Sequence, residues 1–159
     1  MTVPIKRRLE GRRGFTLIEL IITVTVIAII VGMALPLTRN TIKRQREYEL
    51  RDSLREMRIA IDKFKDASDK GVIQPTLEGG GYPAKLQDLV DGVPMVGQVD
   101  KKLKFLRRIP IDPMTRGQEW GMRSYQDDPK STSWGGQNVF DVFTKSEGIA
   151  LDGSKYNEW

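Results

Sequence analysis

The stretch FTLIELIITVTVIAIIVGMALPL, residues 15–37, decides how this chain is built. It contains a single charged side chain, that of Glu19. As a helix it would be roughly 34 Å long, which is close to the thickness of the hydrocarbon core of a bilayer. We therefore expect residues 15–37 to span a membrane as one helix.

The residues before this stretch are strongly basic. Residues 1–14 contain Lys6, Arg7, Arg8, Arg12 and Arg13 against one acid, Glu10. By the positive-inside rule this charge places the N-terminus in the cytoplasm and everything after residue 37 across the membrane. Four further basic residues just after the stretch argue the other way, but they are less concentrated: Arg39, Lys43, Arg44 and Arg46.

Composition excludes several classes of function. The net charge is +5, of which residues 1–14 supply five positive charges less one negative, leaving +1 for the rest. A basic footprint for nucleic acid is therefore absent from residues 15–159. The chain has no cysteine and no histidine, so it lacks the commonest general base and the thiol nucleophile. We expect neither an enzyme nor a nucleic-acid-binding protein.

A helical pattern continues beyond Pro36. Leu50, Leu54, Met57, Ile61 and Phe64 follow one another at spacings of four, three, four and three, which predicts one apolar helix face. The charged positions of ELRDSLREMRIAIDKFKD, residues 49–66, are interpreted as the solvated back of that helix. Gly71 ends the pattern.

After Gly71 the sequence predicts a small β-structure. Short strands are expected at 122–125 and 138–144, and AKLQDLVDG, residues 84–92, reads as one or two helical turns. The tail SEGIALDGSKYNEW, residues 146–159, is interpreted as a long ordered loop or short strand. The expected fold is α+β, with a long N-terminal helix, half membrane-spanning and half amphipathic, packed on a small antiparallel sheet. The expected segments are a leader (1–14), a membrane helix (15–37) and a globular domain (38–159).

Glu19 does not fit an ordinary membrane anchor. A carboxylate inside an apolar segment costs several kcal/mol unless it has a partner, and residues 15–37 contain no basic side chain. Cleavage between Gly14 and Phe15 would create an α-amino group at the same depth, which Glu19 of a neighbouring chain could neutralise. The alternative is that Glu19 reaches the interface from near the helix end.

The residues RRGFTLIEL, 12–20, resemble the processing motif of type IV pilins and pseudopilins. The resemblance implies that a prepilin peptidase cuts after Gly14 and methylates the amine of Phe15. It also implies that Glu19 helps the subunit to enter a filament.

The resemblance extends to GYPAKLQDLV (81–90), FLRRIPIDPMT (105–115) and the segment from NVFDVFT to the end (138–159). These blocks are similar to the major pseudopilins of type II secretion. That similarity implies a pilin-like fold and a homopolymeric periplasmic pseudopilus, with other pseudopilins and an inner-membrane secretion platform as partners. The absence of cysteine favours a pseudopilin over pilus-forming relatives that close loops with disulfides.

The same resemblance implies a calcium ion in the C-terminal loop. Glu147 and Asp152, with Glu158 as a third candidate, are the acidic residues available there. Calcium takes six to eight oxygen ligands, so this set is sparse, and solvated turn acids are the alternative interpretation.

Three alternatives to a pseudopilin remain open from the sequence. The first is a subunit of a type IV pilus. The second is a periplasmic binding protein whose first 34 residues are a signal peptide, because Gly32-Met33-Ala34 has small residues at the spacing that signal peptidase uses. The third is an anchored hydrolase using Asp with Ser or Lys, although no such constellation has the required spacing.

Overall fold

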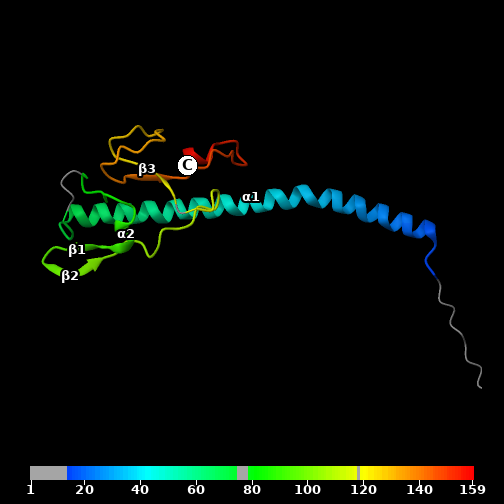
Figure 1. Cartoon of the computed structure of the whole chain (residues 1–159), viewed down its shortest axis with the longest axis horizontal. Helices are drawn as coiled ribbons and strands as arrows, with labels where there is room; N and C mark the ends of the chain where they lie inside the picture. The colour runs from blue at the N-terminus through cyan, green and yellow to red at the C-terminus, as the bar shows by residue number, and fades with distance from the viewer. Residues whose placement is uncertain (1–13, 75–78, 118) are drawn as a thin grey trace, which may run out of the picture. The chain divides into compact units, whose positions relative to one another are not determined.

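A computed structural model of the 159-residue chain describes residues 14–74, 79–117 and 119–159, without the side chains of residues 33–39 and 99. The chain divides into two compact units, Met1–Thr41 and Ile42–Trp159, which we describe separately. Its elements are α1 (Leu17–Asp69), α2 (Asp88–Asp91), β1 (Val93–Met95), β2 (Gln98–Leu103), β3 (Gly121–Arg123), β4 (Asp141–Phe143) and the 3₁₀-helix η1 (Tyr156–Glu158) (Figure 1).

In the second unit, α1 buries the predicted apolar face. All five residues of the stripe from Leu50 to Phe64 are at most 2% exposed, which confirms the helical period read from the sequence. The helix then ends at a left-handed glycine, Gly71, whose φ is +67°. The amide of Val72 donates to the carbonyl of Ala67 (2.9 Å) and that of Gly71 to Ser68 (3.0 Å), which is the Schellman arrangement. Gly71 therefore stops the helix as predicted.

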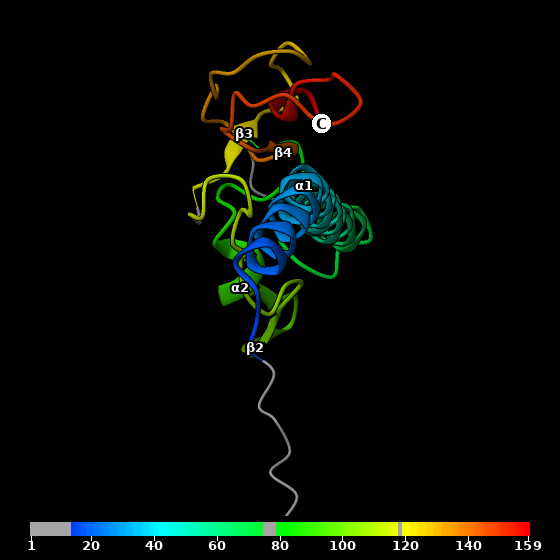
Figure 2. The same ribbon diagram turned by 90° about the vertical axis from the view of Figure 1, so that its right-hand side faces the viewer.

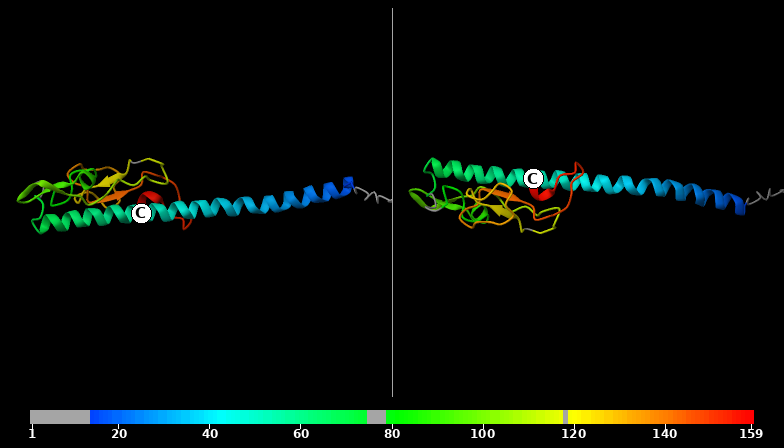
Figure 3. Two further views of the ribbon diagram at one scale, coloured as in Figure 1. Left: turned by 90° about the horizontal axis from the view of Figure 1, so that it is seen from below. Right: turned by 90° about the horizontal axis from the view of Figure 1, so that it is seen from above.

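The strands form two separate antiparallel pairs. β1 pairs with β2, with Val93 opposite Leu103, and β3 pairs with β4, with Gly121 opposite Phe143. The non-helical part of the second unit forms a layer against one flank of α1 (Figure 3). β1 and β2 lie at one edge of this layer and β3 and β4 at the other (Figure 2).

The prediction of one small sheet is therefore corrected to two two-stranded sheets. β3 overlaps the predicted strand at 122–125 but begins one residue earlier, and β4 lies within the predicted 138–144; each is only three residues long. The hairpin of β1 and β2 was not predicted, whereas α2 confirms the expected helical turn. The tail is an ordered loop as expected, with one isolated bridge between Ile149 and Lys155 followed by η1.

The core lies between the buried face of α1 and this layer. Leu89 of α2, Ile73, Val139 and Val142 are all 0% exposed and pack in the same cluster as the stripe of α1. Trp120 is 3% exposed, and its indole N–H donates to the carbonyl of Pro110 (3.0 Å). One continuous core thus holds both strand pairs and the C-terminal loop on the helix.

Candidate functional site

The start of α1 carries the predicted processing and assembly residues. Gly14 and Phe15 precede the helix and are both exposed, Phe15 by 81%. Apart from Gly14 and its chain neighbours, no described residue has a heavy atom within 4 Å of where a Cβ on Gly14 would be. Packing within the described chain therefore places no demand for glycine at this position. Of the predicted basic leader, residues 1–14, all but Gly14 lie outside the described residues.

Thr16 and Glu19 begin the helix. The backbone N–H of Glu19 donates to Oγ1 of Thr16 (3.3 Å), and the N–H of Leu20 donates to the carbonyl of Thr16 (3.1 Å). Thr16 is thus the N-cap, and Glu19 lies in the first turn, where the helix dipole favours a negative charge. Residues 16–19, TLIE, have the spacing of a helix capping box, which is the local signal for this helix start.

The carboxylate of Glu19 is free in the described chain. It is exposed, and none of the described residues donates a hydrogen bond to it or forms an ion pair with it. Only its backbone N–H takes part in the cap, so the side chain remains available to a group from another molecule. This arrangement is compatible with the predicted pairing of Glu19 with the amine of Phe15 in a neighbouring chain.

The helix surface after Glu19 is apolar and exposed. Seven of its large side chains illustrate this, each exposed by about half: Leu20, Ile21, Ile22, Val24, Ile27, Ile29 and Ile30. The hydroxyls of Thr23 and Thr25 donate to the carbonyls of Leu20 (2.9 Å) and Ile21 (2.7 Å). The two polar groups are therefore satisfied within the helix, and the surface offers apolar contact.

Among the described residues, no helix combines the length and the apolar character that crossing a membrane requires.

The comparison with known families gives one match, on this segment. Residues 11–35 match the prokaryotic N-terminal methylation motif. The chain carries a type IV pilin-like, prepilin-type processing motif. The match covers Gly14, Phe15 and Glu19 together with most of the apolar stretch. Neither the curated proteins nor the solved structures give a match.

The acidic residues predicted for calcium do not form an ion site. Asp152 uses Oδ1 to accept from the N–H (2.9 Å) and the hydroxyl (2.6 Å) of Ser154, and its Oδ2 lies 3.4 Å from Nη2 of Arg51. These hydrogen bonds from Ser154, with a smaller effect of the Arg51 charge, lower the pKa of Asp152. Glu147 and Glu158 are exposed. The described part of the chain contains no group of three acidic or other ligand side chains suited to a metal. The residues present therefore do not fit a calcium shell.

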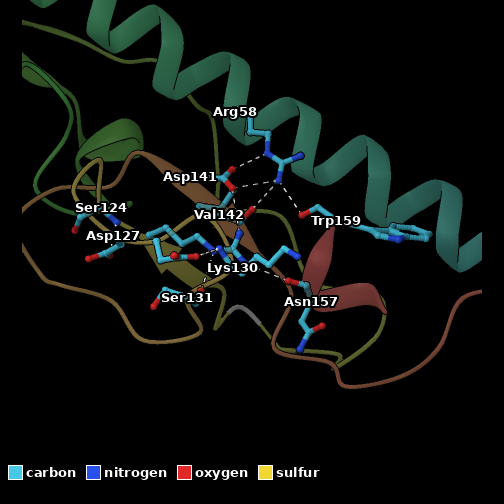
Figure 4. Close-up of polar contacts among 11 residues, drawn as sticks. Arg58, Ser124, Asp127, Lys130, Ser131, Asp141, Val142, Asn157 and Trp159 are labelled. Carbon is cyan, nitrogen blue, oxygen red and sulfur yellow. Dashed lines mark hydrogen bonds and ion pairs between the residues drawn. The ribbon is translucent and has the colours of Figure 1, made fainter. Parts of the chain in front are cut away.

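A second polar cluster, which the sequence did not reveal, joins α1 to the strands. Asp141 at the start of β4 accepts from Nε of Arg58 on α1 (2.7 Å) (Figure 4). It also accepts from Nη1 of Arg123 on β3 (3.2 Å). Arg58 also donates to the carbonyls of Val142 (3.2 Å) and Trp159 (2.9 Å). The sequence pattern predicts that the charged back of this helix is solvated. For Arg58 that prediction is wrong, because its guanidinium holds two other segments.

Arg123 is the buried member of the cluster, with 6% of its surface exposed. It donates to the carbonyls of Ser131 (2.8 Å) and Asn157 (3.2 Å), and its guanidinium carbon lies 4.0 Å from the centre of the Phe143 ring. A buried guanidinium needs such partners, because an unpaired charge in the interior is costly. The cluster is structural in character.

Proposed function

We propose that this protein is a structural, non-enzymatic subunit of a type II secretion pseudopilus. Prepilin peptidase cuts it after Gly14 and methylates the new amine of Phe15. Residues 15–37 then hold it in the bacterial inner membrane, with the N-terminus cytoplasmic and residues 38–159 periplasmic. The subunit polymerises with copies of itself through the N-terminal helix, alongside other pseudopilins and the secretion platform, to support export across the outer membrane.

The observation that carries this proposal is the methylation motif at residues 11–35, which includes an exposed Glu19 carboxylate with no described partner. The apolar surface of α1 after Glu19 supplies the contact area that lipid or neighbouring helices would cover. The choice of a pseudopilus over a type IV pilus rests on the sequence blocks after residue 80 and on the absence of cysteine.

Processing is tested by the mass of the mature chain. We expect the protein from a host that expresses prepilin peptidase to begin at Phe15 and to be about 14 Da heavier than that peptide, the mass of one added methylene. Gly14→Ala should block cleavage, whereas Gly32→Ala should not. Both glycines have open space around a Cβ, so crowding cannot explain a difference. A mature chain beginning at Leu35 would instead identify a signal peptide.

Assembly is tested by Glu19→Leu. Removing the charge makes membrane insertion easier by about 2.5 kcal/mol or more. If Glu19 pairs with the Phe15 amine of the next subunit, the substitution leaves that amine unpaired, at a cost of about 3 to 5 kcal/mol per contact. We therefore expect a protein that is cleaved and membrane-associated but forms no filaments.

Thr16→Ala is the matched control for this test. It removes the helix cap, worth about 1 kcal/mol, and leaves the carboxylate in place. Filament yield should survive in Thr16→Ala. Normal filaments from Glu19→Leu, or equal losses in both variants, would rule out Glu19 as the assembly determinant.

A further inference from the structure

The C-terminal segment, residues 148–159, folds back on itself and lies against α1. The N–H of Ala150 donates to the carbonyl of Ser154 (2.8 Å), and the N–H of Tyr156 donates to that of Gly148 (3.1 Å). These bonds close a tight loop around Asp152. The segment has little regular structure beyond this loop and η1, so its position depends on what holds it to the helix.

Glu47 of α1 holds one side of the loop. Its Oε1 accepts from the N–H of Leu151 (2.8 Å) and from the hydroxyl of Tyr156 (2.9 Å). Tyr156 is 4% exposed and packs edge-on against Trp159, with ring centres 5.2 Å apart. One carboxylate thus binds the loop to the helix at two points.

Arg51, one helical turn later, holds the other side. Its guanidinium lies 3.4 Å from Oδ2 of Asp152, and its central carbon lies 4.2 Å from the centre of the Trp159 ring. The indole N–H of Trp159 donates in turn to the hydroxyl of Ser154 (2.7 Å). A positive charge therefore already lies between the one carboxylate of the loop and its aromatic cover.

This arrangement conflicts with the ion that the family resemblance implies. Calcium needs six to eight oxygen ligands and several negative charges. Both oxygens of Asp152 are engaged, and a divalent ion beside it would be repelled by the guanidinium of Arg51. The segment is therefore held on α1 by groups of the protein itself.

We propose that Arg51 is the cation that closes the C-terminal segment of this protein, so that the segment docks on α1 without bound calcium. This inference concerns the fold of the second unit and does not depend on the proposed function, because neither processing nor assembly enters the test.

The test compares two neighbouring arginines in the full chain, purified in detergent. Arg51→Ala removes the cation, whereas Arg55→Ala removes an exposed arginine for which the described residues offer no ion-pair partner. Trypsin cleavage after the exposed Lys155, followed as release of residues 156–159 by mass spectrometry, reports how often the segment opens. An exposed ion pair and a cation–π contact together predict that Arg51→Ala speeds this cleavage about tenfold. Arg55→Ala should stay within about twofold of wild type.

A second variant and calcium complete the test. Arg51→Gln keeps much of the side-chain stem but not the charge, and it should also cleave several times faster than wild type if the full truncation disturbs folding. Wild-type cleavage should be the same in millimolar calcium and in a chelator, since calcium modules of extracellular proteins bind in that range. Equal rates for Arg51→Gln and wild type would overturn the proposal, as would a several-fold protection of the wild type by calcium.

Discussion

Glu47 illustrates how one side chain connects the sequence to the fold. It lies on the helix face that touches the tail, and its carboxylate accepts the hydroxyl of Tyr156 across 109 positions of the chain. Burial of the phenol, and then the hydrogen bond and negative charge of Glu47, raise the pKa of Tyr156 to about 12 from its usual value of 10. The folded protein therefore holds this proton more tightly than the unfolded chain does.

The raised pKa of Tyr156 predicts that the folded protein loses stability at alkaline pH. Because the folded-state pKa is the higher one, the stabilising contribution is complete below pH 10 and is lost as the pH rises through about 12. Two pKa units correspond to at most about 3 kcal/mol of the free energy of unfolding. Urea unfolding between pH 8 and the highest accessible pH should show this loss in wild type.

Two variants isolate the contribution of Tyr156. Tyr156→Phe should have a lower free energy of unfolding at neutral pH but a flatter alkaline decline, because no phenol proton remains at that position. Tyr125→Phe changes a tyrosine that is 65% exposed and should keep the wild-type decline. Lysine deprotonation is common to all three proteins. Parallel curves for Tyr156→Phe and wild type would contradict the assignment.

At this scale the residues that hold the segments together could not be predicted from the sequence. Glu47, Arg51 and Arg58 have the same character as neighbours such as Arg55, and only the fold shows which of them meet another segment. Their contacts lie 83 to 109 positions away along the chain. The roles of Gly14, Phe15 and Glu19 are predicted from a local motif, and the family match covers the same residues.

Among the elements, α1 was predictable and the hairpin of β1 and β2 was not. The apolar stripe of α1 repeats over several turns, which makes its period unambiguous. The hairpin contains Pro94 and Gly97, and Asp100, Lys101 and Lys102 follow one another in β2. It is held by long-range contacts, including the N–H of Val96 donating to the carbonyl of Val72 (2.8 Å) and a bridge between Ile73 and Met95. Tertiary context thus overrides local preference.

Asp141 of β4 binds side chains from α1 and β3, so we expect its removal to lower the free energy of unfolding strongly. Asp141→Ala would leave the buried Arg123 without its carboxylate, and breaking one half of a buried pair costs about 3 kcal/mol or more. Urea unfolding followed by tryptophan fluorescence measures this in the full chain, because Trp120, Trp134 and Trp159 all lie in the second unit.

Glu119→Ala is the control for this experiment. Glu119 pairs with Lys145 at 3.3 Å, but its side chain is 89% exposed, so its removal should cost no more than about 1 kcal/mol. If both alanine variants lose the same small amount, the cluster contributes less to the second unit than its burial indicates.

At the scale of the whole molecule, the second unit has the features of a domain that folds by itself. Its core joins α1, α2, both strand pairs and the C-terminal loop, and every residue of that core lies after position 49. We therefore predict that residues 42–159, expressed without the first unit, form a soluble monomer with one cooperative unfolding transition.

Two isoleucines on α1 test whether this fragment uses the same core. Ile61 is 1% exposed and Ile59 is 45% exposed, two positions apart on the same helix. Ile61→Ala removes buried methyl groups and should lower the free energy of unfolding by about 2 to 5 kcal/mol. Ile59→Ala should change it by less than about 1 kcal/mol, because most surface substitutions are nearly neutral. A fragment that aggregates, unfolds without cooperativity, or loses equal stability in the two variants would show that the second unit needs residues before position 42 to form this core.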